Sequence, residues 1–137
     1  MKPAFSLCCS FFALLFFLSC ENKEMEVWNL RCEYLNSPIA IESKTPLLSW
    51  QLKSDKRGKS QSAYRILVAG DPGLLREKTA DLWDSGIINS SQSVSVKYDG
   101  KPLTSRRQVY WKVMAWDEKG ESTEWSDVAS LIGLQNG

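Results

Sequence analysis

Histidine is absent from the 137-residue sequence. Its absence excludes nucleophile relays and general bases that depend on imidazole, and it removes the usual zinc ligand. Charge of one sign is also lacking, since 17 basic residues against 16 acidic ones leave a formal net charge of +1. That balance gives no indication of nucleic acid or of a strongly acidic partner. The sequence also lacks a glycine-rich phosphate loop, an internal repeat and a low-complexity tract.

Cysteine is scarce, and three of the four cysteines lie at or before residue 20. Only Cys32 remains in the rest of the chain, so we expect no intramolecular disulfide and a fold held by its core alone. Cys32 alternates with polar residues in the segment 27–35. We expect it to be buried and unreactive, because no cationic cluster is placed to lower the pKa of its thiol.

The N-terminal segment 1–19 has the layout of a secretory signal: one lysine, then an apolar run over 4–18 that is too short for a comfortable membrane span. It ends in FFLSC and resembles a bacterial lipoprotein signal, in which Cys20 is lipidated and becomes the mature N-terminus. The alternative is an ordinary signal peptide in which Cys20 is incidental. The lipoprotein interpretation predicts an exported protein, periplasmic or at the cell surface. It would be anchored to a membrane through lipid and a polar tether over 20–26.

The sequence from residue 27 to 137 predicts a single all-β domain. Alternating apolar and polar residues predict strands over 27–35, 47–53, 63–69, 82–88, 93–98, 109–116 and 125–134. One or two helical turns are expected around 74–78. About seven short strands at fairly regular spacing indicate an antiparallel β-sandwich of immunoglobulin or fibronectin type III kind.

The segment 109–120, VYWKVMAWDEKG, is the central strand of this prediction and ends in a turn. Its two faces differ: Val109, Trp111, Val113 and Ala115 form a wholly apolar one, and Tyr110, Lys112, Met114 and Trp116 an aromatic one with a single charge. We expect the first face to pack in the core with Trp50. The second face is unlikely to meet only water, because aromatic residues and methionine are enriched at interfaces.

The tryptophans leave two interpretations open, because exposed aromatic rings stack on sugars as well as on proteins. Trp28, Trp83, Trp116 and Trp125 can belong to a domain interface or to a carbohydrate-binding surface. The candidate interface or glycan contacts are Tyr110, Met114, Trp116 and Trp83.

Three short motifs stand out: QSAYRILVA, WDSG, and YWKV followed by WDEKG. Together with CEYLNSPIAIES, TPLLSWQLK and WSDVASLIGL, they resemble the N-terminal β-sandwich domain of bacterial α-L-rhamnosidases, over residues 30–134. The resemblance implies a fibronectin type III-like module that, in the family, precedes further β-domains and a helical barrel with the catalytic carboxylates. No catalytic residue of the family has a matching position here. The implied role is a non-catalytic accessory module of an exported glycoside hydrolase, with the rest of such an enzyme as its partner.

Catalysis by this chain itself is the weakest alternative. Glycoside hydrolysis needs two carboxylates roughly 5 to 10 Å apart, and the candidates are Asp84, Asp117, Glu118 and Glu121. Asp84 and Asp117 lie at strand ends and turns, where aspartate commonly bonds the local backbone. DEKGE predicts a hairpin turn and not a calcium loop. We therefore expect no catalytic residue, cofactor or metal, and keep a free-standing surface lipoprotein that binds glycan or protein as the alternative function.

Overall fold

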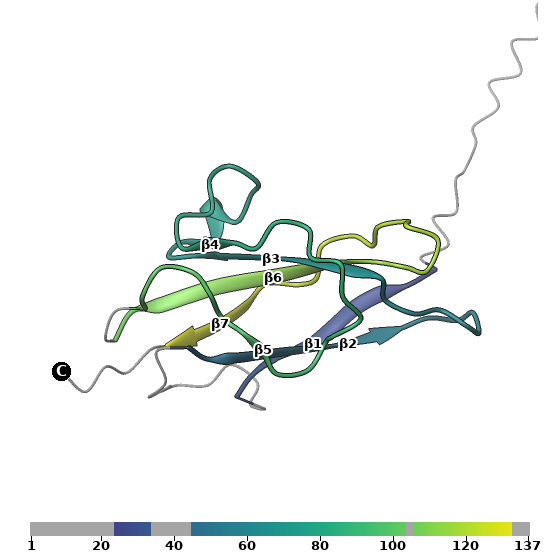
Figure 1. Ribbon diagram of the computed structural model, residues 1–137. Helices are drawn as coiled ribbons and strands as arrows, with labels where there is room; N and C mark the ends of the chain where they lie inside the picture. Colours follow the sequence, from purple (N-terminus) through teal and green to yellow (C-terminus); the bar gives the residue numbers. More distant parts are fainter. Residues whose placement is uncertain (1–23, 34–44, 104–105, 133–137) are drawn as a thin grey trace, which may run out of the picture.

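The computed structural model describes residues 24–33, 45–103 and 106–132. In these ranges the chain forms two antiparallel sheets packed face to face (Figure 1). The first sheet has the order β1-β2-β5, with β1 (Glu26–Cys32), β2 (Leu47–Lys53) and β5 (Val96–Lys97). The second has the order β4-β3-β6-β7, with β4 (Trp83–Asp84), β3 (Ala63–Ala69), β6 (Gln108–Trp116) and β7 (Ala129–Ile132). The predicted all-β sandwich is confirmed.

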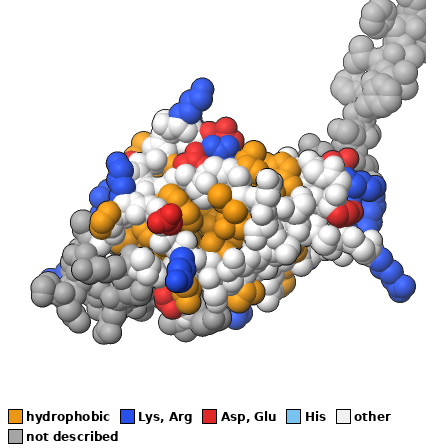
Figure 2. Space-filling view, viewed as in Figure 1, with side chains coloured by type: hydrophobic (Ala, Val, Ile, Leu, Met, Phe, Trp, Pro, Cys, Tyr) orange, Lys and Arg blue, Asp and Glu red, His pale blue; other side chains and the backbone are white. Residues whose placement is uncertain are grey.

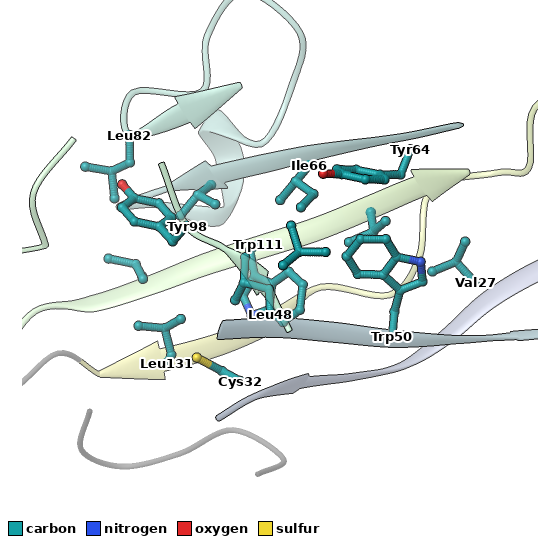
Figure 3. Close-up of a cluster of buried hydrophobic side chains, with 14 of the residues drawn as sticks. Val27, Cys32, Leu48, Trp50, Tyr64, Ile66, Leu82, Tyr98, Trp111 and Leu131 are labelled. Carbon is teal, nitrogen blue, oxygen red and sulfur yellow. The ribbon is translucent and has the colours of Figure 1, made fainter. Parts of the chain in front are cut away.

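The main core lies between the sheets and is built around β6. Alternate β6 side chains point inward, and Trp111 is only 1% exposed. Leu48 and Trp50 from β2 and Ile66 from β3 point into the same space in Figure 3. The Trp50 ring packs edge-on against Tyr64, with ring centroids 5.1 Å apart. The predicted inward positions of Trp50 and Trp111 are confirmed.

β3 is buried on both faces because it is central in its sheet and covered by its own following loop. Leu67 and Ala69 point away from the main core and are buried against Leu75 in a second, smaller cluster. A nearly continuous apolar strand is what such two-sided burial requires. β3 therefore carries no solvent-facing apolar side chain from Ile66 to Ala69.

The helical turn after β3 lies earlier than predicted and is shorter. It is a single 3-10 turn, η1 (Pro72–Leu74), whereas the sequence predicted helix around 74–78. Pro72 fixes a helical φ at the first position, and the Asp71 side chain accepts a hydrogen bond from the Gly73 N–H at 2.7 Å. These two residues set the start of the turn.

β4 and β5 are two-residue strands, shorter than the predicted strands 82–88 and 93–98. The segment between them crosses from one sheet to the other and divides its backbone bonds between both (Figure 1). Ile88 exchanges two bonds with Tyr64 of one sheet, at 2.9 and 2.8 Å, and the Ser93 carbonyl accepts from the Trp50 N–H of the other at 2.9 Å. Gly86, with φ at 65°, allows the bend that begins the crossing.

β7 begins later than the predicted 125–134 strand. In the segment before it, side-chain hydroxyls and not backbone carbonyls accept the hydrogen bonds from the N–H groups of β6. The Ser126 hydroxyl accepts from the Val113 N–H at 3.0 Å while the Ser126 N–H donates to the Val113 carbonyl at 2.9 Å. Thr123 makes the same exchange with Ala115, at 3.1 and 2.8 Å. These hydroxyls satisfy the buried donors of β6 where no strand partner is present.

β1 contains a β-bulge that breaks its simple alternation. Trp28 lies opposite Gln51 and Arg31 opposite Ser49, so the two residues between, Asn29 and Leu30, face a single residue of β2. Asn29 has φ at 51°, a left-handed conformation that asparagine tolerates better than most residues. The bulge lets Val27 and Cys32 both face the core although an even number of residues separates them.

The described residues already pack in the core before residue 27. Met25 is buried in the main core, and β1 starts at Glu26. The predicted signal 1–19 and Cys20 lie outside the described residues. In the ranges that are described, no helix has the length and apolarity to cross a bilayer.

Candidate binding surfaces

The outer face of the four-stranded sheet carries the predicted contact residues. Tyr110, Lys112, Met114 and Trp116 are all half-buried and alternate with the core residues of β6. The register places β3 residues beside them on the same face, with Arg65 opposite Met114 and Ala63 opposite Trp116. The face is therefore aromatic and apolar with two cationic side chains, as the sequence predicted for β6.

The protein itself covers one end of this face. Tyr110 and Trp125 pack against the small cluster of Leu67, Ala69 and Leu75. The Lys112 ammonium lies 4.8 Å from the centre of the Trp125 ring, and burial lowers the pKa of Lys112, with Arg76 lowering it further. Tyr110 is thus part of the domain's own packing more than of a free surface.

Arg65 is held rigidly on this face. Its Nε and Nη2 donate to the two carboxylate oxygens of Asp84 at 2.9 and 2.7 Å, and its Nη1 lies 3.0 Å from Glu77. Asp84 also accepts from the Gly86 N–H at 2.9 Å. The hydrogen bond from Arg65 is the main cause that lowers the pKa of Asp84. Asp84 is an ion-pair and turn residue, in agreement with the local backbone bonding predicted for it.

Met114 and Trp116 form the end of the face that remains uncovered. Among the described residues they belong to neither buried cluster, although each is only half-exposed. Lys112 borders them. We call Lys112, Met114 and Trp116 the outer-face patch.

A cluster of charges closes the end of the sandwich where the turns 54–60 and 117–121 lie (Figure 2). Lys59 is at its centre, with a side chain only 6% exposed. Its ammonium lies 2.8 Å from Glu24, 3.1 Å from Asp117 and 3.3 Å from Glu118. Hydrogen bonds from Lys56 and then Lys59 lower the pKa of Glu24 to about 2.

The acidic residues of this cluster bond to Lys59 and to the backbone of the turn. Carboxylate oxygens of Glu24, Asp117 and Glu121 lie within 4.8 Å of one another. However, the Lys59 ammonium already supplies a positive charge between two of them. Asp117 also accepts from the N–H groups of Lys119 and Glu121, both at 2.9 Å. Its pKa is lowered because these bonds and Lys59 outweigh burial, which acts to raise it.

The two remaining candidate tryptophans differ in their surroundings. The Trp83 ring is half-buried against the main core and meets Tyr98 edge-on, with centroids 5.3 Å apart. Trp28, on the edge strand β1, is 43% exposed. Trp28 is therefore the more exposed of the two residues.

A family model described as "Rha78A-like, N-terminal immunoglobulin domain" matches residues 27–134. The chain belongs to this family. Two α-L-rhamnosidases of Formosa agariphila are 49% identical over 92 residues and 39% identical over 131 residues, which are 67% and 93% of this chain. The structure of the Streptomyces avermitilis α-L-rhamnosidase complexed with L-rhamnose matches 80% of the chain, with a TM-score of 0.77 and 35% identity.

This immunoglobulin domain corresponds to a small part of each relative. It spans 10% and 14% of the two Formosa agariphila proteins and 10% of the Streptomyces avermitilis chain. The resemblance to the N-terminal domain of α-L-rhamnosidases, stated from the sequence motifs, is confirmed.

The sequence prediction missed Gln61, which links the core of the domain to the crossing segment. Gln61 is buried and accepts a hydrogen bond from the Trp50 indole N–H at 2.9 Å. Its amide nitrogen donates to the carbonyls of Ser90 and Gln92 at 3.0 and 2.8 Å. Gln61 is the first residue of the QSAYRILVA motif, so the signal was present in the sequence without an assigned role.

Cys32 agrees with its prediction. It is buried, and burial raises the pKa of its thiol to about 12. The protonated, enclosed thiol has no nucleophilic character at neutral pH.

Proposed function

We propose that this domain is a non-catalytic accessory module of an exported α-L-rhamnosidase-like glycoside hydrolase and docks against the rest of that enzyme. The observation that carries the proposal is the family match over residues 27–134, combined with the small share of each rhamnosidase that the chain spans. The acidic residues support it. A glycosidase general acid needs a raised pKa, whereas the pKa values of Asp84, Asp117 and Glu118 are all lowered.

Hydrolysis provides the first test. The purified chain should release no chromophore from an aryl α-L-rhamnoside under conditions in which a complete rhamnosidase does. Release that is proportional to protein concentration and is abolished by Asp84→Asn or Asp117→Asn would contradict the non-catalytic role.

Docking occurs through the outer-face patch. Trp116 and Met114 supply the apolar contact types enriched at interfaces, and the aliphatic stem of Lys112 extends the apolar area. Tyr110 borders the patch and supports it from the small cluster. Trp83 pairs with Val68 in the register, on the core-facing side of the sheet, and its ring meets Tyr98 there, so we place it outside this docking surface.

Binding to the remainder of a relative tests this surface. The 39% identical Formosa agariphila rhamnosidase, truncated to remove its own matching domain, should bind the chain in isothermal titration calorimetry. Met114→Ser combined with Trp116→Ser should weaken binding at least about tenfold, since interface residues of this kind contribute more than about 1 kcal/mol each. The matched control is Ile87→Ser, which alters an exposed apolar residue elsewhere. Equal binding by both variants would remove the patch from the interface.

Weak self-association is expected when the partner is absent, because an uncovered apolar patch favours contact between copies. Sedimentation at high concentration should show association of the wild-type chain, reduced by replacing Tyr110, Met114 and Trp116 with serine. A strictly monomeric wild type, together with an unfolded triple variant, would identify this face as ordinary core.

The proposal includes export and membrane anchoring through a lipid on Cys20. Its support is the FFLSC boundary at the end of an apolar run. Metabolic labelling with a palmitate analogue should mark the wild-type protein and not Cys20→Ala. A labelled and membrane-bound Cys20→Ala protein would contradict it.

A free-standing surface lipoprotein that binds glycan is the second candidate, and the exposed ring of Trp28 favours it. An adjacent reading frame that encodes a helical barrel domain would favour the first candidate.

A further inference from the structure

A groove of about 340 Å³ lies where the edges of the two sheets approach each other, between β1 and the segment that leads into β7. The lining residues are Glu26, Val27, Trp28, Asn29, Leu30, Lys53, Asp127, Val128 and Ala129. A smaller cavity of about 110 Å³ adjoins it and shares Glu26, Val27 and Asp127. The two follow one seam of the sandwich, and none of the residues that line them belongs to the outer-face patch.

The groove combines one exposed aromatic ring with hydrogen-bonding side chains. Trp28 is the most exposed tryptophan of the described residues. Around it, Glu26 and Asp127 offer carboxylate acceptors, while Lys53 and Asn29 offer donors. A sugar ring has one or two faces of C–H groups and an edge of hydroxyls. Its binding site therefore needs an aromatic ring for the C–H face and hydrogen-bonding side chains for the hydroxyls.

The β1 bulge places Asn29 and Leu30 in the groove, next to Trp28. It lies on an edge strand, where Asn29 and Leu30 leave the regular register with β2. Bulges of this kind re-aim side chains and are common beside binding sites. Asn29 holds a left-handed backbone conformation there, and its side-chain oxygen accepts from Arg31 at 3.4 Å.

Lys53 contacts the Trp28 ring through a weak cation–π interaction that a ligand can displace. Its ammonium lies 5.2 Å from the centre of the Trp28 ring and 3.4 Å from Glu26. Both side chains of this ion pair are about half exposed, and cation–π contacts at exposed positions are weak. A sugar ring can therefore replace Lys53 over the indole while the ion pair with Glu26 keeps the lysine nearby.

We infer that this seam is a binding site for a neutral oligosaccharide, with Trp28 as the stacking platform. The charges argue against a protein occupant, because the centre of a protein interface is depleted in charged residues, whereas Glu26, Lys53 and Asp127 line this groove. The main cavity is at the small end for ligand sites, and the adjoining cavity provides room for a following sugar unit. The inference deepens the glycan-binding part of the proposed function, and it uses a surface separate from the docking patch.

Nuclear magnetic resonance of the ¹⁵N-labelled chain tests the inference through the Trp28 indole N–H, which is assigned by its loss in Trp28→Phe. The probes are L-rhamnose, an α-linked rhamno-oligosaccharide and maltotriose. At least one should shift this resonance saturably, with a dissociation constant on the order of millimolar. Trp28→Ala should weaken binding roughly tenfold or more, as followed by the backbone resonances of Val128 and Ala129, because it removes the stacking partner.

Two controls separate stacking from folding. Trp28→Phe keeps an aromatic face and should retain binding within a few-fold, as followed by backbone resonances of Val128 and Ala129. Ile87→Ala removes an exposed apolar residue outside the groove and should bind as the wild type does.

Three results would overturn the inference. The first is that none of the three saccharides shifts the Trp28 resonance. The second is saturable binding that persists unchanged in Trp28→Ala. The third is a concentration-dependent shift of the Trp28 resonance without sugar that persists when Met114 and Trp116 are replaced by serine, which would make the groove a protein interface. None of these results bears on calorimetric docking through Met114 and Trp116, so the two proposals fail separately.

Discussion

Replacement of Gln61 by leucine should destabilise the domain by about 2 to 4 kcal/mol. Gln61 makes three hydrogen bonds, one from Trp50 and two to the carbonyls of Ser90 and Gln92. Each contributes about 1 kcal/mol net, and a buried donor left without a partner costs about 1 to 3 kcal/mol. The Trp50 N–H would be such a donor, whereas the two carbonyls are only partly buried and can accept from water. The loss is a large share of a typical unfolding free energy of about 5 to 15 kcal/mol.

Urea unfolding followed by tryptophan fluorescence measures this loss. The slope of the unfolding free energy against urea concentration should stay unchanged if the folded state is intact. Gln92→Leu is the matched control. Its side-chain amide also donates to two carbonyls, those of Val94 and Ser95, but it does so at the surface. We expect the control to lose less than about 1 kcal/mol.

Gln61→Glu separates the acceptor from the donors. The introduced carboxylate can still accept from Trp50, but it would face the carbonyls of Ser90 and Gln92 without a proton to donate. Its pKa should therefore be raised in the folded state. A group of this kind favours folding most below its unfolded pKa, so the deficit relative to wild type should shrink as pH falls toward 4. A Gln61→Leu variant as stable as Gln92→Leu, or a Gln61→Glu deficit independent of pH, would refute the reasoning.

Three further predictions concern the core, the charge cluster and the cysteine. Trp111→Ala should lose about 3 to 5 kcal/mol in urea unfolding, and Trp111→Phe less, because the Trp111 indole N–H has no hydrogen-bond partner among the described residues; equal losses would contradict this. The lowered pKa of Glu24 means that its contribution to stability is present above about pH 4 and is lost as pH falls toward 2. The fall in melting temperature over that range should be smaller in Lys59→Met, and an identical acid profile would exclude the cluster as its source. The Cys32 thiol should resist a thiol reagent at pH 8 in the folded protein and react after unfolding in urea; rapid reaction of the folded form would show that it is accessible.

The long strands could be predicted from the sequence because burial on alternating faces leaves a direct pattern. The predicted segments 47–53 and 63–69 coincide with β2 and β3, and 109–116 differs from β6 by one residue. The segments 82–88 and 93–98 also alternate, yet they form only two-residue strands. Periodicity shows which side chains face the core, but not where the backbone bonds of a crossing segment go.

The binding surfaces were less predictable, because they depend on contacts between residues far apart in the chain. The alternation of β6 indicated a second aromatic face, but not that Leu75 and Trp125 would cover its Tyr110 end. No local pattern around Lys59 indicates its contact with Asp117, which lies 58 positions away in the chain. Trp28 could be marked as a possible contact, but the groove beside it is formed together with Asp127, Val128 and Ala129, which no local pattern indicated.

The edges of the two sheets have a consequence for how other molecules can join this domain. In the part of the chain that the structure describes, β4 and β5 pair over two residues each, β7 over four, and the seven-residue β1 is interrupted by its bulge. A long, regular edge would be a template for adding a strand from another chain, in binding or in aggregation. The short and interrupted edge strands of this domain offer few consecutive backbone groups with which such a strand could pair. Recognition by this domain should therefore depend on side-chain chemistry, and it should tolerate backbone changes in a partner that a strand-adding domain would not.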